Sequence, residues 1–240
     1  MRGILITFEG IDGSGKSTIA AEVARKIAEE EEPPFAGRRF LFTAEPTDGE
    51  EGRLIRERLR RDLAGGGTET LIQKMRDSRM EGAEKMEELF LFMADHAHHL
   101  AETVIPALEE GMVVISDRYS DSRVAYQGAT LREVVPRPLE LVTELHRPWS
   151  VHPDRTILFS IDPALAMERC LLRQGEEAMS TKAKAREKFE REEFLREVAE
   201  NFEVMAKQEP ERFIVIDAAR EKSKILAETM EVLAQILEEV

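Results

Sequence analysis

Five short apolar runs, spread along the whole chain, constrain the fold more than any other feature. They are Ile4 to Phe8, Arg39 to Thr43, Met112 to Ser116, Thr156 to Ile161 and Phe213 to Ile216. Nearly every position in them is apolar, rather than every second one, which is typical of strands covered on both faces. Long stretches with helical spacing separate them, at 16–32, 86–110, 189–207 and 222–239. This alternation predicts an α/β fold in which a five-stranded parallel sheet is flanked by helices in three layers.

The alternation continues across the chain, so we expect a single domain over residues 1–240. Three consecutive glycines and the polar residues after them, near 64–82, predict one mobile segment. A second is predicted near 174–191, where it would form a lid. Neither is a domain boundary, because no set of strands is complete on one side of either.

The charge balance excludes several classes of partner. The chain has 48 acidic side chains against 34 Lys and Arg, a net charge of −14. Such a surface repels nucleic acid and anionic membranes, so neither is an expected partner. The lone Cys170 cannot form an internal disulfide, and no apolar run is long enough to span a bilayer. Since Met1 to Phe8 also lacks the apolar core of a signal peptide, we expect a cytoplasmic protein.

A phosphate-binding pattern follows the first apolar run. Gly10 to Thr18 reads GIDGSGKST and matches G-x-x-x-x-G-K-[ST], the P-loop. Between a strand and a helix, backbone N–H groups converge on an anion with the helix dipole behind them. We expect Lys16 to reach the β- and γ-phosphates of ATP and the Ser17 hydroxyl to hold Mg²⁺. The predicted nucleotide-binding residues are Gly10, Asp12, Gly13, Ser14, Gly15, Lys16, Ser17 and Thr18. The alternative is a glycine-rich turn with a solvated lysine.

Two large groups of P-loop proteins are excluded by missing motifs. Asn201 is the only asparagine and stands in Glu200-Asn201-Phe202, so the N-K-x-D base-reading motif of Ras-type GTPases is absent. A signature resembling L-S-G-G-Q of ABC-type ATPases is absent as well. Small-molecule kinases and a few ATP-driven scaffolds remain.

The third apolar run ends in an acid and a base, Asp117 and Arg118. The carboxyl end of a central parallel strand faces the crevice where such sheets bind ligands. We expect Asp117 to hold Mg²⁺ through water and Arg118 to neutralise charge on the transferred phosphoryl group. The alternative is a salt-bridged strand end.

With these motifs in place, the chain resembles the thymidylate kinases over nearly its whole length. The matching segments after the P-loop are Thr43-Ala44-Glu45-Pro46, Ile55-Arg56, Glu88 to His96, Val104 to Leu108, Asp117-Arg118-Tyr119, Ala125-Tyr126-Gln127-Gly128, Pro153-Asp154 and Ile214 to Ala218. The resemblance implies a P-loop NTPase fold, a homodimer, and transfer of the ATP γ-phosphoryl group to the 5′-phosphate of dTMP.

The resemblance also implies roles on the acceptor side. Phe92 would stack on the base, Tyr126 would close over the sugar with Asp12 near its 3′-hydroxyl, and Arg56 and Arg118 would hold the acceptor phosphate. The implied substrate-binding residues are Asp12, Glu45, Pro46, Arg56, Phe92, His96, Arg118, Arg123, Tyr126 and Gln127. An ordinary core position is the alternative for Phe92.

The second basic feature is the segment Met179 to Arg191, with five basic residues against two acids. In P-loop kinases a lid at this place closes over ATP. The resemblance implies a catalytic arginine that comes either from the P-loop or from the lid. Residues 11–14 of the P-loop contain no base, so we expect the lid to supply it, from Arg173, Arg186 or Arg191. Arg186 and Arg191 join Lys16, Asp117 and Arg118 as predicted catalytic residues. A solvated helix with mixed charges is the alternative.

Several positions depart from the family pattern, so the chain is identified as a divergent member. Ala44 and His96 replace arginines, and Arg123 stands where a small or amide residue is usual. Ser160 and Glu187-Lys188 depart on the fourth strand and in the lid. Either Arg123 supplies the guanidinium lost at His96, or the pocket accepts another nucleoside monophosphate; a non-catalytic ATP-binding switch on the same fold is the third hypothesis. The spacing of His96 and His99 suits a metal, but the sequence suggests no third ligand.

Overall fold

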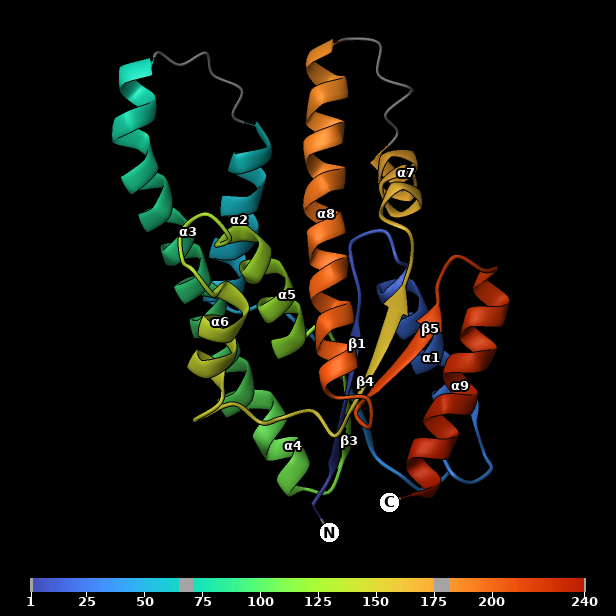
Figure 1. The fold of residues 1–240 in the computed structure, drawn as a ribbon. Coiled ribbons are helices and arrows are strands. Elements are labelled where there is room, and N and C mark those ends of the chain that lie inside the picture. Colours follow the sequence, from blue (N-terminus) through green and yellow to red (C-terminus); the bar gives the residue numbers. More distant parts are fainter. Residues whose placement is uncertain (1, 65–70, 175–181, 240) are drawn as a thin grey trace.

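The chain folds into three layers around a central parallel sheet (Figure 1), in a computed structural model that describes residues 2–64, 71–174 and 182–239. The strands are β1 (Ile4–Glu9), β2 (Phe40–Ala44), β3 (Val113–Asp117), β4 (Arg155–Ser160) and β5 (Phe213–Asp217). They lie in the order β2-β3-β1-β4-β5 and all pair in parallel. The predicted α/β class and five-stranded parallel sheet are confirmed, and each strand lies within one residue of its apolar run at the amino end.

Burial explains why nearly every position in the apolar runs is apolar. All six residues of β1 are buried, and so are the first four of β3, because helices cover both faces of the central strands. The edge strands β2 and β5 are only partly covered, and Val215 of β5 is 54% exposed. Since β1 lies between β3 and β4, the loop after it opens at the centre of the carboxyl edge, where the strand order reverses.

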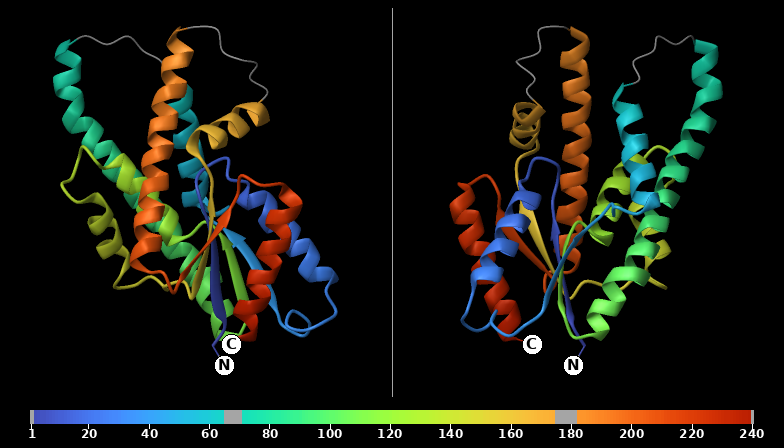
Figure 2. Two further views of the ribbon diagram at one scale, coloured as in Figure 1. Left: turned by 45° about the vertical axis from the view of Figure 1, so that its right-hand side comes forward. Right: turned by 180° about the vertical axis from the view of Figure 1, so that it is seen from behind.

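Helices α1 (Lys16–Glu29) and α9 (Lys222–Glu238) cover one face of the sheet, and α4 (Ile105–Glu109), α5 (Ser120–Thr130) and α8 (Lys182–Gln208) lie on the other (Figure 2). The remaining helices are α2 (Glu50–Ala64), α3 (Leu71–His99), α6 (Pro138–His146) and α7 (Pro163–Gln174). A π-helical turn at Leu100–Val104 joins α3 to α4, so the predicted 86–110 helix is present as a nearly continuous rod. None of the helices in the described ranges is long and apolar enough to cross a membrane.

Helix boundaries differ from expectation where polar residues weaken the apolar periodicity. α3 begins at Leu71 rather than Met86, and α8 begins at Lys182 rather than Phe189. Residues 71–82 of the segment predicted to be mobile therefore lie in α3, and 182–191 of the predicted lid lie in α8. Ala64 is the last residue of α2 and Gln174 the last of α7, and the remaining residues of the two segments, 65–70 and 175–181, lie outside the described residues. The single-domain assignment remains a prediction.

Candidate functional site

The turn between β1 and α1 requires glycine at defined positions. Gly10, Gly13 and Gly15 have φ angles of 143°, 86° and 88°, which L side chains rarely adopt. A Cβ on Gly10 would lie 2.6 Å from the Phe159 carbonyl oxygen, and one on Gly13 would lie 2.2 Å from that of Ala166. The turn therefore packs closely against the end of β4 and the start of α7. It leads into α1, whose first turn carries no acid and no side-chain cap. Its free N–H groups and positive dipole end suit a phosphate.

Lys16 lies buried at the centre of this turn, at 5% exposure. Burial, with Arg118 nearby, lowers the pKa of the lysine to about 8, although Asp12 and Asp117 act in the opposite direction. The buried Ser14 Oγ and Asp117 Oδ1 find no hydrogen-bond partner among the described residues. A buried cation near a carboxylate with one unsatisfied oxygen fits a triphosphate with a hydrated Mg²⁺ ion. Ser17 is exposed in the first turn of α1, where it is free to contact that ion.

The turn after β3 is anchored by Glu9, a residue that the sequence analysis did not select. Its Oε1 accepts hydrogen bonds from the backbone N–H groups of Tyr119 (2.8 Å) and Ser122 (3.2 Å), and its Oε2 accepts one from Ser122 Oγ. Burial, with Asp121 nearby, raises the pKa of Glu9 to about 8. The available signal was an acid directly after the apolar run Ile4 to Phe8. Through these bonds β1 holds Arg118 at a φ of 69°, in the left-handed region.

Arg118 is thereby directed toward the glycine turn. Its Nη1 donates to Ser122 Oγ (2.8 Å), and its Nη2 donates to Asp12 Oδ1 (2.6 Å) and to Tyr126 Oη (3.1 Å). Tyr126 Oη also accepts the backbone N–H of Asp12 (2.9 Å). The structure thus brings Arg118 and Tyr126 into direct contact with Asp12, which lies more than 100 residues before them in the sequence.

Two more of the predicted acceptor residues meet at the turn after β2. Arg56 of α2 donates from Nη1 to the Pro46 carbonyl oxygen (3.0 Å) and from Nη2 to Asp48 (3.1 Å).

Two other predicted acceptor residues lie where α3 meets α5. Phe92 is half-buried on α3, and its carbonyl oxygen lies 3.5 Å from Arg123 Nη1. Gln127 of α5 donates from Nε2 to Glu88 Oε1 of α3 (2.8 Å).

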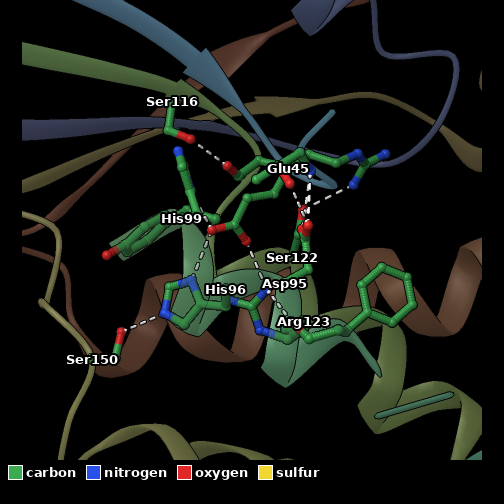
Figure 3. A network of polar contacts seen from close by, with 12 residues as sticks. Glu45, Asp95, His96, His99, Ser116, Ser122, Arg123 and Ser150 are labelled. Atoms are coloured by element: carbon green, nitrogen blue, oxygen red, sulfur yellow. Dashed lines mark hydrogen bonds and ion pairs between the residues drawn. The ribbon is translucent and has the colours of Figure 1, made fainter. Parts of the chain in front are cut away.

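Glu45 forms the centre of a buried polar network (Figure 3). Its Oε1 accepts hydrogen bonds from Nδ1 of His96 and of His99, both 2.7 Å, and its Oε2 accepts one from Arg123 Nη1 at 2.6 Å. Arg123 Nε in turn donates to His146 Nε2 (2.6 Å). Burial alone would raise the pKa of Glu45, but Arg123 and the two imidazoles hold it well below its usual range. The network therefore contains one carboxylate and one guanidinium in mutual contact.

The hydrogen-bond partners determine the tautomers of the histidines. His96 and His99 both donate from Nδ1 to Glu45. The Nε2 atom of His96 accepts from Ser150 (2.8 Å), and that of His99 lies 2.7 Å from Thr43 Oγ1. Burial beside Arg123 lowers the pKa of His96 to about 4, so its ring is neutral. His96 is fully buried with both ring nitrogens engaged, and it has no nitrogen left for a nucleotide base. The structure places this predicted substrate-binding residue inside the protein.

The same cluster does not suit a metal ion. One ligand atom from each of Glu45, His96 and His99 lies within 4.8 Å of the others. However, Glu45 Oε1 lies 2.7 Å from each imidazole nitrogen, whereas ligands about a tetrahedral zinc at 2.0–2.1 Å are about 3.3 Å apart. Arg123 adds a positive charge at the same carboxylate. Glu45 is thus the third candidate ligand that the sequence did not suggest, but the short distances are those of a hydrogen-bonded network.

Of the three candidate lid arginines, the structure describes the side chain of one. Arg191 is half-buried on α8. Arg186 also belongs to α8, and Arg173 belongs to α7, but their side chains lie outside the described residues. The choice among them remains a prediction.

Comparison with known proteins identifies the family. The family model described as thymidylate kinase matches residues 8–229. A probable thymidylate kinase of Methanosarcina mazei is 44% identical over 240 residues, covering 100% of both chains. One of Methanosarcina acetivorans is 49% identical over 221 residues, covering 91% of this chain and 89% of the relative. One of Halobacterium salinarum is 38% identical over 234 residues, covering 98% and 97%.

Proposed function

The chain belongs to the thymidylate kinase family, and we propose that it transfers the γ-phosphoryl group of ATP to dTMP to give dTDP. The convergence of Lys16, Asp117 and Arg118 on the glycine turn carries this proposal. Lys16 is a buried cation with a lowered pKa, and Asp117 has a carboxylate oxygen without a hydrogen-bond partner among the described residues. Arg118 lies between the donor side and the acceptor side of the site.

On the donor side, the backbone N–H groups from Gly13 to Thr18 bind the β- and γ-phosphates, and Lys16 pairs with them. Ser17 and, through water, Asp117 are the residues that would hold Mg²⁺, whose charge neutralises the phosphate oxygens when it is bound. Because the described part of this site already has its glycine geometry, little rearrangement is needed to admit ATP.

On the acceptor side, Phe92 stacks on the base, Tyr126 closes over the sugar near Asp12, and Arg56 holds the 5′-phosphate with Arg118. Arg118 exchanges its contact with Asp12 for a phosphate oxygen when dTMP binds. An oxygen of that phosphate attacks the γ-phosphorus, the bond to the bridging β,γ-oxygen breaks, and ADP leaves. Arg118 and one lid arginine, Arg186 or Arg191, stabilise the charge on the transferred group.

The two other hypotheses receive less support. A non-catalytic switch has no need of Arg118, yet Glu9 and Ser122 hold this arginine in a left-handed conformation beside the phosphate site. A kinase for another monophosphate is the outcome that the assay below would detect. The homodimer and the cytoplasmic location remain predictions.

The proposal is tested by coupled ADP release with ATP, Mg²⁺ and each nucleoside monophosphate. The wild-type protein should prefer dTMP, and Lys16→Ala should lower kcat by about 10²–10³, the effect of losing one well-placed donor to the transition state. Lys26→Ala, at an exposed site on the same helix, is the matched control and should leave the rate unchanged. Since Lys16 is buried, circular dichroism should show that the variant is folded. Undiminished dTMP-dependent ADP release in folded Lys16→Ala would disprove the proposed donor site.

A further inference from the structure

The turn between β2 and α2 is held from both sides. At its start, the backbone N–H of Glu45 donates to the carbonyl oxygen of Asp117 at the end of β3 (3.1 Å). Two residues later, the backbone N–H of Thr47 donates to both carboxylate oxygens of Asp95 on α3, at 3.2 and 3.0 Å. Thr47 Oγ1 donates to the same carboxylate (2.5 Å). Pro46 lies between these two anchor points, so β3 and α3 together set its position.

The Asp95 carboxylate is completely buried, and burial of a charged group costs free energy unless hydrogen bonds compensate for it. Among the described residues, the donors to this carboxylate belong to a single residue, Thr47. Thr47 Oγ1 also accepts the backbone N–H of Gly49 (3.1 Å), directly before α2 begins. Asp95 therefore orders the whole turn, up to the start of α2.

The same turn contacts α2, the helix that carries Arg56. A Cβ on Gly52 would lie 1.9 Å from the Thr47 carbonyl oxygen and 2.9 Å from Asp95 Oδ1, so only glycine allows this close approach. Gly52 and Arg56 are four residues apart and lie on one face of α2. From that face Arg56 Nη1 donates to the Pro46 carbonyl oxygen (3.0 Å). Arg56 is thus bound to the carbonyl group that lies between the two anchor points of the turn.

We propose that Asp95 is a positioning residue for the acceptor phosphate, because it fixes the turn to which Arg56 is bound. This inference rests on the proposed function, in which Arg56 and Arg118 bind the 5′-phosphate of dTMP. Arg118 follows Asp117, the other anchor of the turn, so the turn sets the separation of the two arginines. Arg56 Nη2 pairs with Asp48, whose side chain is fully exposed, and water weakens such a pair. Nη2 is therefore the nitrogen that a phosphate takes.

Asp95→Asn tests this anchor with little change of shape. Since the backbone N–H of Thr47 contacts both oxygens, either orientation of the new amide places its NH₂ group against that N–H. The turn then shifts and carries Arg56 away from the phosphate. The Kd for dTMP, measured by isothermal titration calorimetry, should rise about 10- to 100-fold, the effect of losing one hydrogen bond to a charged group. The KM for ATP should stay within about twofold of the wild type.

Thymidine distinguishes a misplaced Arg56 from a general loss of structure. This nucleoside has the base and the sugar of dTMP but no 5′-phosphate, so it offers nothing for Arg56 to bind. Its Ki as a competitive inhibitor against dTMP should change less than about threefold in Asp95→Asn. Asp154→Asn is the matched control, because Asp154 also accepts a backbone N–H, that of Leu5 (2.8 Å), but lies at the amino edge of the sheet. It should bind dTMP as the wild type does.

A double-mutant cycle tests whether Asp95 acts through Arg56. If it does, Asp95→Asn should weaken dTMP binding no further in a protein that already carries Arg56→Ala, whereas independent effects would multiply. Two variants of Thr47 keep the Asp95 carboxylate and test the inference even if Asp95→Asn fails to fold. Thr47→Val lacks the hydroxyl and should raise the Kd for dTMP about 3- to 10-fold, whereas Thr47→Ser keeps it and should bind dTMP as the wild type does.

The outcomes separate the inference from the proposed function. If the wild type does not phosphorylate dTMP, or if Arg56→Ala does not weaken dTMP binding, the proposed acceptor site is wrong and the inference fails with it. If Arg56→Ala weakens dTMP binding but folded Asp95→Asn or Thr47→Val does not, the kinase stands and the role of Asp95 is refuted. An equal loss of affinity for thymidine, or full additivity in the double variant, refutes it as well.

Discussion

The buried contact between Glu45 and Arg123 predicts that Glu45→Gln lowers the free energy of unfolding. The two side chains are 4% and 3% exposed, and they meet at 2.6 Å. In Glu45→Gln the side-chain shape is kept, but the guanidinium loses its counter-ion. The new amide also cannot accept from Arg123 on one side and from both imidazoles on the other, because one of its ends is a donor.

The cost follows from burial. Removing one partner of a buried ion pair costs about 3–5 kcal/mol, because the other charge is left without compensation in a medium of low polarity. For a chain of this length each kcal/mol lowers Tm by about 2–4 °C, so we expect a decrease of about 6–20 °C. Urea denaturation at pH 7, followed by far-UV circular dichroism, measures the change in unfolding free energy.

A matched control uses the same substitution in an exposed ion pair. Glu110 meets Arg39 at 2.9 Å, but the two side chains are 62% and 59% exposed. Water and salt screen such pairs, so Glu110→Gln should cost about 0–1 kcal/mol. If Glu45→Gln costs no more than Glu110→Gln, the buried network does not depend on the charge of Glu45 and the argument is wrong.

Two further predictions concern the network and the phosphate turn. Burial beside Arg123 lowers the pKa of His146 from 6.5 to about 3, so below pH 6.5 the unfolded chain takes up a proton that the folded chain refuses. The free energy of unfolding should therefore fall by about 2 kcal/mol between pH 7 and pH 5 on account of His146. Urea titrations at the two pH values should show a loss of stability that is smaller by this amount in His146→Gln than in the wild type. Equal losses in the two proteins would contradict the lowered pKa of His146. Gly13→Ala should lower Tm more than Gly15→Ala, because both have positive φ but only a Cβ at Gly13 meets backbone, 2.2 Å from Ala166; thermal melts showing similar decreases would count against the close approach.

The sequence alone determined the sheet and the phosphate turn. Both follow from patterns that are local in the sequence. Continuous apolar runs indicate buried parallel strands. Glycines at set distances from Lys16 indicate a backbone turn whose positive φ angles favour glycine. The position of Asp117 and Arg118 at a strand end followed from the same reasoning, since carboxyl ends of parallel strands share one edge. Helix starts were less predictable, as at Leu71 of α3, because polar stretches carry little periodicity.

The acceptor side was decided by tertiary structure. Glu45, His96, Arg123 and His146 come from the turn after β2, from α3, from α5 and from the end of α6, and no local pattern says that they meet. The resemblance implied that His96 binds substrate, whereas packing of α3 against that turn buries it with both nitrogens engaged. The type of a residue determines which hydrogen bonds its side chain can make. Only the packing of distant elements decides which of them are used inside the protein and which are left for a ligand.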